Sequence, residues 1–187
     1  LGKPSSDSDG INWVDNDNFK CAYQITELLI KAGRKKIVFA GASPNFGISI
    51  DKVEGYKKAL TDYGQPVNEE YIIAGKFITE NGYSMMQKII ESGIEPDAIV
   101  AQDDMLAFGM MTKMQELGYK IPEDIAIASF DNVQTSEYFR PGLTTVDMNA
   151  FDLGVKACEL LLSCIENKKA GYSNIIVPSK IIERESI

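Results

Sequence analysis

PDAIVAQDDMLAFG, residues 96–109, joins a short apolar run, a polar turn and the start of a helical pattern. Residues 98–101 are continuously apolar, which is typical of a strand buried on both faces of a parallel sheet. From Met105 to Leu117 the apolar residues have helical spacing, and Gly118 follows where a helix needs a residue with positive φ to end. The stretch therefore predicts one strand–turn–helix unit of an α/β fold.

The same unit recurs along the chain. Three other helical patterns also end at a glycine, at Gly33, Gly64 and Gly93, and short apolar runs lie between them. Repetition of strand, helix and glycine predicts βαβ units and hence a parallel sheet covered by helices. The predicted helices are residues 19–32, 52–63, 82–92, 105–117 and 151–166, and the predicted strands are residues 37–40, 71–74, 98–101, 125–130, 143–146, 175–177 and 181–182.

The composition is that of an acidic globular protein with little of the common catalytic chemistry. Of 187 residues, 44% are hydrophobic and 25% charged, and the formal net charge of −8 predicts a poor nucleic-acid surface because phosphates are repelled. No histidine is present, which excludes Ser-His-Asp and Cys-His nucleophile systems and removes the commonest metal ligand. We therefore predict no catalytic residue, no metal site and no cofactor.

Cysteine usage and hydropathy bear on where the protein works. Cys21, Cys158 and Cys164 are odd in number and lack the spacing of a metal site, which predicts free thiols in a reducing cytoplasm. No apolar run approaches the ~20 residues that a membrane span requires. No leader is visible, although a chain that starts at Leu1 can be a fragment that has lost one. The interpretation is a cytoplasmic protein without a membrane partner.

Polar and aromatic residues follow the predicted strands at the ends where parallel α/β sheets bind ligands. Asp103 and Asp131 each follow a strand directly, Phe77 comes shortly after another, and Lys52 lies early in a helix. Carboxylates hydrogen-bond to hydroxyls, an aromatic face packs on a sugar ring, and a lysine adds a charge-assisted donor. The set predicts a sugar-binding site. The alternative is that both aspartates are helix N-caps and Phe77 belongs to the core.

The carboxylates also raise the alternative of a glycosidase. Such enzymes hold two carboxylates about 5–9 Å apart, which Asp103 and Asp131 can reach from neighbouring strands but adjacent Asp103 and Asp104 cannot. No nucleophile elbow, phosphate loop or dinucleotide motif occurs, so a binding protein is favoured over an enzyme.

Seven motifs, which together run from Val14 to the C-terminus, occur in the order found in one known family. They are VDNDN (14–18), LIKAGRKKIVFAG (29–41), KVEGY (52–56), PDAIVAQDDMLAFG (96–109), ELGYKIPEDIAIASFDN (116–132), LTTVDMNAFDLG (143–154) and ERES (183–186). With these motifs the chain resembles the effector-binding domain of the lac-repressor family of bacterial transcription regulators.

The resemblance implies a fold like that of periplasmic sugar-binding proteins, with two parallel-sheet α/β lobes joined by three crossover segments. It also implies that the first lobe is incomplete in this chain and that the family's DNA-binding helix-turn-helix head is absent from it. The expected first lobe is residues 1–33 and 147–170, the expected second lobe is residues 34–146 and 171–187, and the expected crossovers lie near residues 33–35, 145–149 and 170–174.

The resemblance also implies the ligand contacts. Asp103, Asp131 and Phe77 match ligand-contacting positions of the family, whereas Asp104 is expected to be structural, as a cap of the helix. Lys52 stands where the family usually has arginine, so a bidentate fork is replaced by one ammonium group. Lys3 matches the basic residue of a Gly-Arg-Pro segment in the first lobe.

The same resemblance implies that the protein is a repressor. It would respond to a sugar and bind operator DNA as a homodimer through its N-terminal head. Residues 11–18 look most like regulators of maltose operons. Two alternatives stay open at this point. A secreted sugar-binding protein of a transporter would have the same fold, and a glycosidase would use the aspartates as a catalytic pair.

Overall fold

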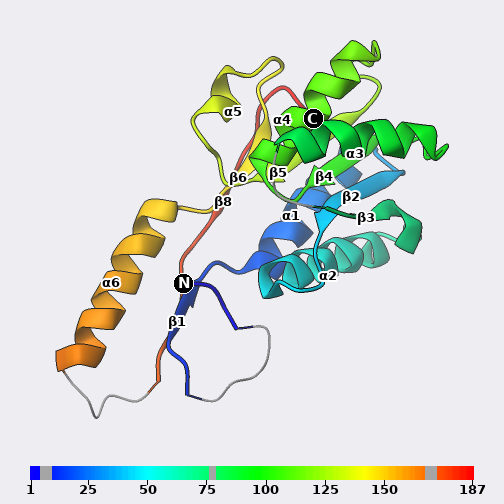
Figure 1. The fold of residues 1–187 in the computed structure, drawn as a ribbon. Coiled ribbons are helices and arrows are strands. Elements are labelled where there is room, and N and C mark those ends of the chain that lie inside the picture. Colours follow the sequence, from blue (N-terminus) through cyan, green and yellow to red (C-terminus); the bar gives the residue numbers. More distant parts are fainter. Residues whose placement is uncertain (5–9, 76–78, 167–171) are drawn as a thin grey trace.

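The largest part of the fold is a six-stranded sheet with the strand order β3-β2-β4-β5-β6-β8. The structure is a computed structural model that describes residues 1–4, 10–75, 79–166 and 172–187 (Figure 1). Within this sheet only β8 runs antiparallel to its neighbour. The strands are β2 (Ile37–Ala42), β3 (Ile72–Ala74), β4 (Ala98–Ala101), β5 (Ala126–Phe130), β6 (Thr144–Asp147) and β8 (Lys180–Ile182).

Helices cover both faces of this sheet, so its central strands are buried on both sides. Ala98 and Val100 of β4 contact the core under α1 and α2, whereas Ile99 and Ala101 contact the core under α3 and α4. This alternation explains the continuously apolar sequence of the strand. The helices are α1 (Asn18–Lys31), α2 (Gly47–Asp62), α3 (Thr79–Glu91), α4 (Asp104–Glu116) and the short α5 (Thr135–Tyr138), with a 3₁₀ turn η1 (Glu69–Tyr71) before β3.

The structure confirms the predicted strands to within two residues and all four predicted helix ends. Gly33, Gly64, Gly93 and Gly118 have φ of 91°, 67°, 80° and 83°, the conformation expected of a glycine that ends a helix. α2 begins five residues earlier than predicted because tertiary contact overrides the poor helix propensity of its glycine, serine and β-branched first turn. Ser49 in that turn is buried and its Oγ accepts a hydrogen bond of 2.7 Å from the Ser43 N–H.

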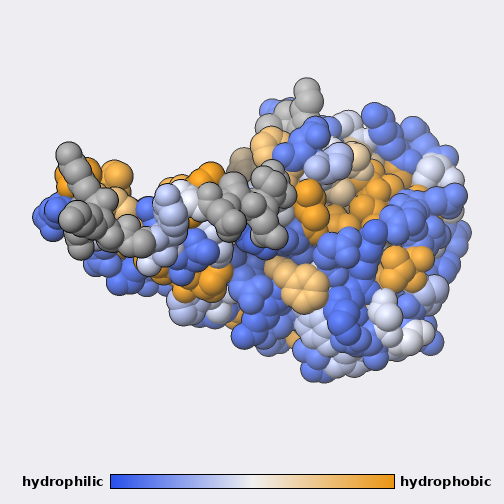
Figure 2. Space-filling model, turned by 90° about the horizontal axis from the view of Figure 1, so that it is seen from below, coloured by the Kyte–Doolittle hydropathy of each residue, from blue (hydrophilic) through white to orange (hydrophobic). Residues whose placement is uncertain are grey.

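A smaller region projects from this body (Figure 1). It consists of β1 (Trp13–Asp15) and β7 (Asn174–Ile176), which pair in parallel, and α6 (Ala150–Glu166). No residue of α6 is buried, and Phe151 is 81% exposed. Figure 2 shows apolar side chains on the surface of this projecting part. We call β1, β7 and α6 the small region, and the six-stranded sheet with α1 to α5 the large region.

Three segments connect the two regions, and Asn16 lies where they meet. The segments join β1 to α1, β6 to α6, and β7 to β8. The buried Asn16 donates from Nδ2 to the backbone oxygens of Met148, at 3.0 Å, and Val177, at 2.9 Å. The Val177 N–H in turn donates to the Asp15 carbonyl at 2.9 Å. One side chain thus ties all three connections together.

The division of the chain differs from the expected lobes at two elements. α1, expected in the first lobe with residues 1–33, packs on α2 and the large sheet, because Ile25 and Leu29 belong to that core. The first connection therefore lies at Asn16 and not near residues 33–35. β7, expected in the second lobe with residues 171–187, pairs instead with β1 in the small region. The third connection therefore follows β7. Residues 170 and 171 of the expected crossover lie outside the described residues.

Candidate functional site

Lys52 is a buried cation at the carboxyl edge of the large sheet, with only 2% of its surface exposed. Its Nζ donates to the backbone oxygen of Gln102 at 3.0 Å and lies 3.9 Å from the centroid of the Phe130 ring. Burial lowers the pKa of this amine, and the carboxylates of Asp131 and Asp103 oppose that change. Lys52 is therefore an internal cation held between the ends of β4 and β5.

Asp103 follows β4 and is half-buried. Its Oδ1 accepts a 2.8 Å hydrogen bond from the Leu106 N–H, so the predicted alternative of a helix N-cap is correct for this residue. Burial raises the pKa of the Asp103 carboxyl, against the effects of this hydrogen bond and of Lys52. The cap accounts for Oδ1 and fixes the side chain at the carboxyl edge of the sheet.

Asp131 follows β5 with a strained backbone. Its φ of 107° is rarely adopted by residues with a side chain, and its N–H donates to the Val146 carbonyl at 2.8 Å. The residue is exposed at the surface, yet the protein around its carboxyl displaces enough water to raise the pKa to about 6. Asp131 caps no helix, because α5 begins only at Thr135. A strained and poorly solvated carboxylate at this edge is typical of a ligand-binding position.

Asp104, next to Asp103, has a different environment. Its Oδ1 accepts from the hydroxyls of Ser129 and Thr145. Its Oδ2 accepts from the Ser136 hydroxyl at 2.6 Å and the Val133 N–H at 2.9 Å. The side chain is fully buried, so the predicted structural role is supported, but by a network that joins α4 to β5, β6 and α5 rather than by capping.

The remaining predicted residues are placed less directly. Lys3 is exposed and its Nζ lies 3.4 Å from Oδ2 of Asp51 on α2, so it bridges from the N-terminal segment to the large region. Its backbone N–H donates to Asp15 at 2.8 Å. Phe77 lies outside the described residues. The structure thus brings together Lys52, Asp103 and Asp131, places Lys3 on the α2 surface and gives no account of Phe77.

Sequence reasoning missed the residues that hold these groups in place. Phe130 was predicted only as part of a strand, yet its ring faces the Lys52 ammonium. Cys21, predicted to be a free thiol, lies 2.9 Å from the Ser179 hydroxyl and interacts electrostatically with Lys52. Cys21 stands in no recognisable motif, and the motif that contains Phe130 does not indicate a contact with a cation. Cys21 lies near Lys52 because α1 packs on α2.

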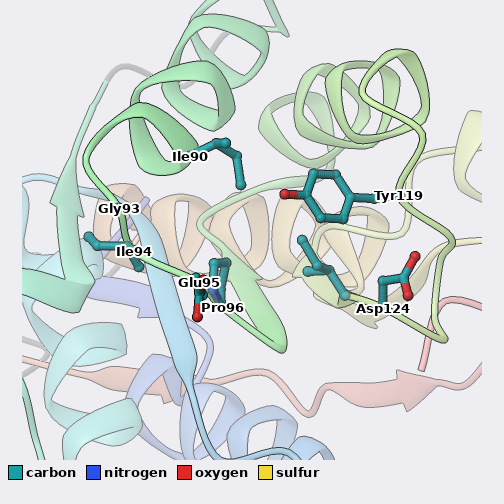
Figure 3. A pocket seen from close by; sticks show the side chains of 8 residues that line it. Ile90, Gly93, Ile94, Glu95, Pro96, Tyr119 and Asp124 are labelled. Atoms are coloured by element: carbon teal, nitrogen blue, oxygen red, sulfur yellow. The ribbon is translucent and has the colours of Figure 1, made fainter.

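A separate cavity of about 340 Å³ lies at the opposite edge of the sheet, before β4 and β5. Figure 3 shows the Tyr119 ring and the end of α3 beside it. Its two carboxylates already have partners, since Glu95 lies 3.6 Å from Lys36 and Asp124 accepts from the Lys120 N–H. None of the predicted ligand-binding residues lines this cavity, so the carboxyl edge is the candidate site.

The fold and the charged carboxyl edge define an α/β ligand-binding domain of the periplasmic-binding-protein type. Residues 26–187 match the periplasmic binding protein-like domain family. Among the described residues no helix is both long and apolar enough to cross a bilayer.

Individual relatives narrow this class to one family. The PurR transcriptional repressor of Vibrio atlanticus is 33% identical over 186 residues, which is 100% of this chain and 55% of that protein. The structure of a putative LacI regulator from Bacillus cereus subsp. cytotoxis has a TM-score of 0.96 at 33% identity, covering 100% of this chain and 66% of that one. A LacI-family regulator from Enterococcus faecium, solved with bound ribose, has a TM-score of 0.88 at 28% identity, covering 97% of this chain and 68% of that one.

The chain therefore belongs to the lac-repressor (LacI) family of transcription regulators, in the part that forms the periplasmic binding protein-like domain. It spans about half the length of the curated relatives that it matches. The Vibrio atlanticus relative is a transcriptional repressor.

Proposed function

We propose that this chain is the effector-binding domain of a cytoplasmic, sugar-responsive transcription regulator. The observation that carries the proposal is the convergence of Asp103, Asp131 and Lys52 at the carboxyl edge of the large sheet. Carboxylates there accept hydrogen bonds from the hydroxyls of a sugar, and the ribose-bound relative supports a ligand of this class. In this proposal Phe77 stacks on the sugar ring and Lys3 contacts it from the N-terminal segment.

The proposed mechanism is binding without chemistry. A sugar held between the large and small regions stabilises one orientation of the two, and the segments tied by Asn16 are where that orientation changes. In a homodimer this change alters the spacing of two N-terminal helix-turn-helix heads and hence the affinity for operator DNA. Shifting such an equilibrium from 1:99 to 99:1 requires about 5.5 kcal/mol of preference for one state.

The proposal is tested by thermal unfolding of the full-length protein against a panel of mono- and disaccharides, with maltose and maltodextrins included. A sugar present at ~100 times its dissociation constant adds about 2.7 kcal/mol of stability, which a melting curve resolves. Asp131→Ala should remove the shift, whereas Asp152→Ala, on the exposed α6, should keep it. If no sugar shifts the wild-type protein, or if both variants keep the shift, the proposed site is wrong.

A further inference from the structure

Among the described residues, the group of charges around Lys52 is more negative than positive. Lys52 interacts electrostatically with three carboxylates, those of Asp131, Asp103 and Asp104. The Asp104 carboxylate is satisfied by its buried network, but it still acts on its neighbours and raises the pKa of Asp131 and Asp103. A ligand that enters at this edge of the sheet therefore meets a net negative field.

Lys52 is poorly placed to serve a ligand, and Lys3, the second lysine proposed to contact the sugar, is paired with Asp51. Lys52 is 2% exposed, and its ammonium group is committed to the Gln102 carbonyl and the Phe130 ring. Asp131, by contrast, is exposed and Asp103 is half-buried. The carboxylates of Asp131 and Asp103 are thus accessible to a ligand. The Lys52 ammonium group, which is buried beneath them, neutralises their charge only in part.

Ionised carboxylates are acceptors only, so the ligand must donate. Burial raises the pKa of Asp131 to about 6, so the carboxylate is ionised at neutral pH. Lys52 balances its negative charge only in part. A positive group on the ligand would supply that compensation through a charge-assisted hydrogen bond. A phosphate would do the opposite, because it brings further negative charge and further acceptors to the same edge.

From this balance we infer that the effector carries a positively charged amine in addition to its hydroxyls, with an amino sugar as the chemical class that fits. The inference rests on the proposed sugar-binding function and narrows it. It requires the amine to lie against Asp131 and Asp103, the two carboxylates that a ligand can reach. Phosphorylated sugars are excluded as effectors, and the uncharged parent sugars bind more weakly.

The experiment compares matched sugars by isothermal titration calorimetry on the full-length protein. For each of the gluco, galacto and manno skeletons, the set comprises the parent sugar, its 2-amino-2-deoxy form, the N-acetyl form and the 6-phosphate. The amino form of one skeleton is expected to bind at least tenfold tighter than its parent, because an ammonium group adds an ion pair to the hydrogen bond that a hydroxyl already makes to the carboxylate. N-acetylation, which keeps the nitrogen but removes the charge, should abolish this advantage.

Two variants separate a specific contact from general attraction to an acidic protein. Asp131→Asn keeps the shape of the side chain and should greatly reduce the preference for the amino sugar over its parent, with Asp103 providing what remains. Asp124→Asn, on the cavity at the opposite edge of the sheet, removes the same charge and should leave the preference intact. Loss of the preference in both variants would show that overall charge causes it, and would overturn the inference.

The outcomes also separate this inference from the function on which it rests. If parent sugars bind and the amino forms bind no tighter, the sugar-sensing function stands and the amine inference fails. Tighter binding of a phosphorylated form would overturn the inference in the same way. If no sugar of any charge binds, both fail together.

Discussion

Leu29 and Leu161 are the same residue on two helices of similar length, and their surroundings are opposite. Leu29 on α1 is 0% exposed in the core under the large sheet, whereas Leu161 on α6 is 60% exposed in the small region. The contrast extends to the whole elements. α1 buries six of its residues and α6 buries none.

The difference shows that an apolar helix face contributes to stability only where another surface covers it. α6 has its own apolar residues, but among the described residues it packs on the short strand β1, which is too small to bury any of them. β1 and β7 form only a two-stranded sheet, which is marginally stable by itself. The large region, with a six-stranded sheet between two helical layers, has a complete core. We therefore expect the stability of this chain to reside in the large region.

The largest effect is expected from Asp104→Ala in the large region. The change removes the acceptor for the Ser129, Thr145 and Ser136 hydroxyls and for the Val133 N–H, which are left inside the protein. Unsatisfied buried donors cost ~1–3 kcal/mol each and do not add fully, so we expect a loss of about 4 kcal/mol. Urea unfolding monitored by circular dichroism measures this.

Asp104→Asn is the matched control for that prediction. It keeps the size of the side chain and one acceptor oxygen, so about half of the loss is expected. A loss below ~1 kcal/mol for Asp104→Ala would contradict the view that this network holds α4, β5 and β6 together.

The second prediction tests the comparison directly with one change in both regions. Leu29→Ala leaves a cavity in a closed core and should lower the free energy of unfolding by about 3 kcal/mol. Leu161→Ala removes a side chain that is already in solvent and should change it by less than ~0.5 kcal/mol. Equal losses in the two variants, measured by urea unfolding, would show that α6 packs as tightly as α1 and would break the comparison.

The sequence predicted the large region well because its periodicity and its packing agree. Continuous apolar runs such as residues 98–101 occur only where both faces of a strand are covered, and the terminal glycines report a local backbone requirement. The small region was predicted less well. β1 is a three-residue strand with little pattern of its own, and it exists through its pairing with β7, far away in the sequence.

The candidate site was predictable in part. The edge of the sheet and the positions of Asp103, Asp131 and Lys52 follow from the strand order and the family resemblance. The depth of Lys52 and the different environments of Asp103 and Asp104 depend on packing between distant segments, which no local pattern contains. The assignment of α1 failed for the same reason, because its apolar face does not say which core it joins.

The third prediction concerns the link between the two regions. Asn16→Ala removes two buried hydrogen bonds, to Met148 and Val177, and should cost about 2 kcal/mol. Asn16→Asp has the same shape but turns an acceptor toward two carbonyl oxygens, so it should cost more than the alanine change. Urea unfolding of both variants checks this order. If Asn16→Asp were the milder change, the side chain would act through its shape and not as a donor.

The smallest effect, and the only gain, is expected for Asp131→Asn. The pKa of Asp131 is raised from 3.8 to about 6 in the folded protein, so between these values the folded state holds a proton that the unfolded chain has released. The free energy of unfolding therefore falls as the pH rises through this window, and above it the wild type carries the full penalty of the charge. Asparagine carries no charge and tolerates a positive φ, so the variant should be more stable at pH 7.5 by about 1 kcal/mol, a value reduced because solvent screens this exposed side chain.

The same reasoning fixes the pH at which this gain disappears. Well below pH 3.8 the wild-type carboxyl is protonated in both states, so the two proteins should unfold at the same urea concentration. Asp152→Asn, on the exposed α6, should differ from wild type by less than ~0.5 kcal/mol at either pH. A destabilised Asp131→Asn at pH 7.5 would mean that the carboxylate makes a favourable contact inside the domain. The strained backbone at Asp131 would then have a structural cause. A gain in stability, by contrast, is what a residue kept for its ligand should give.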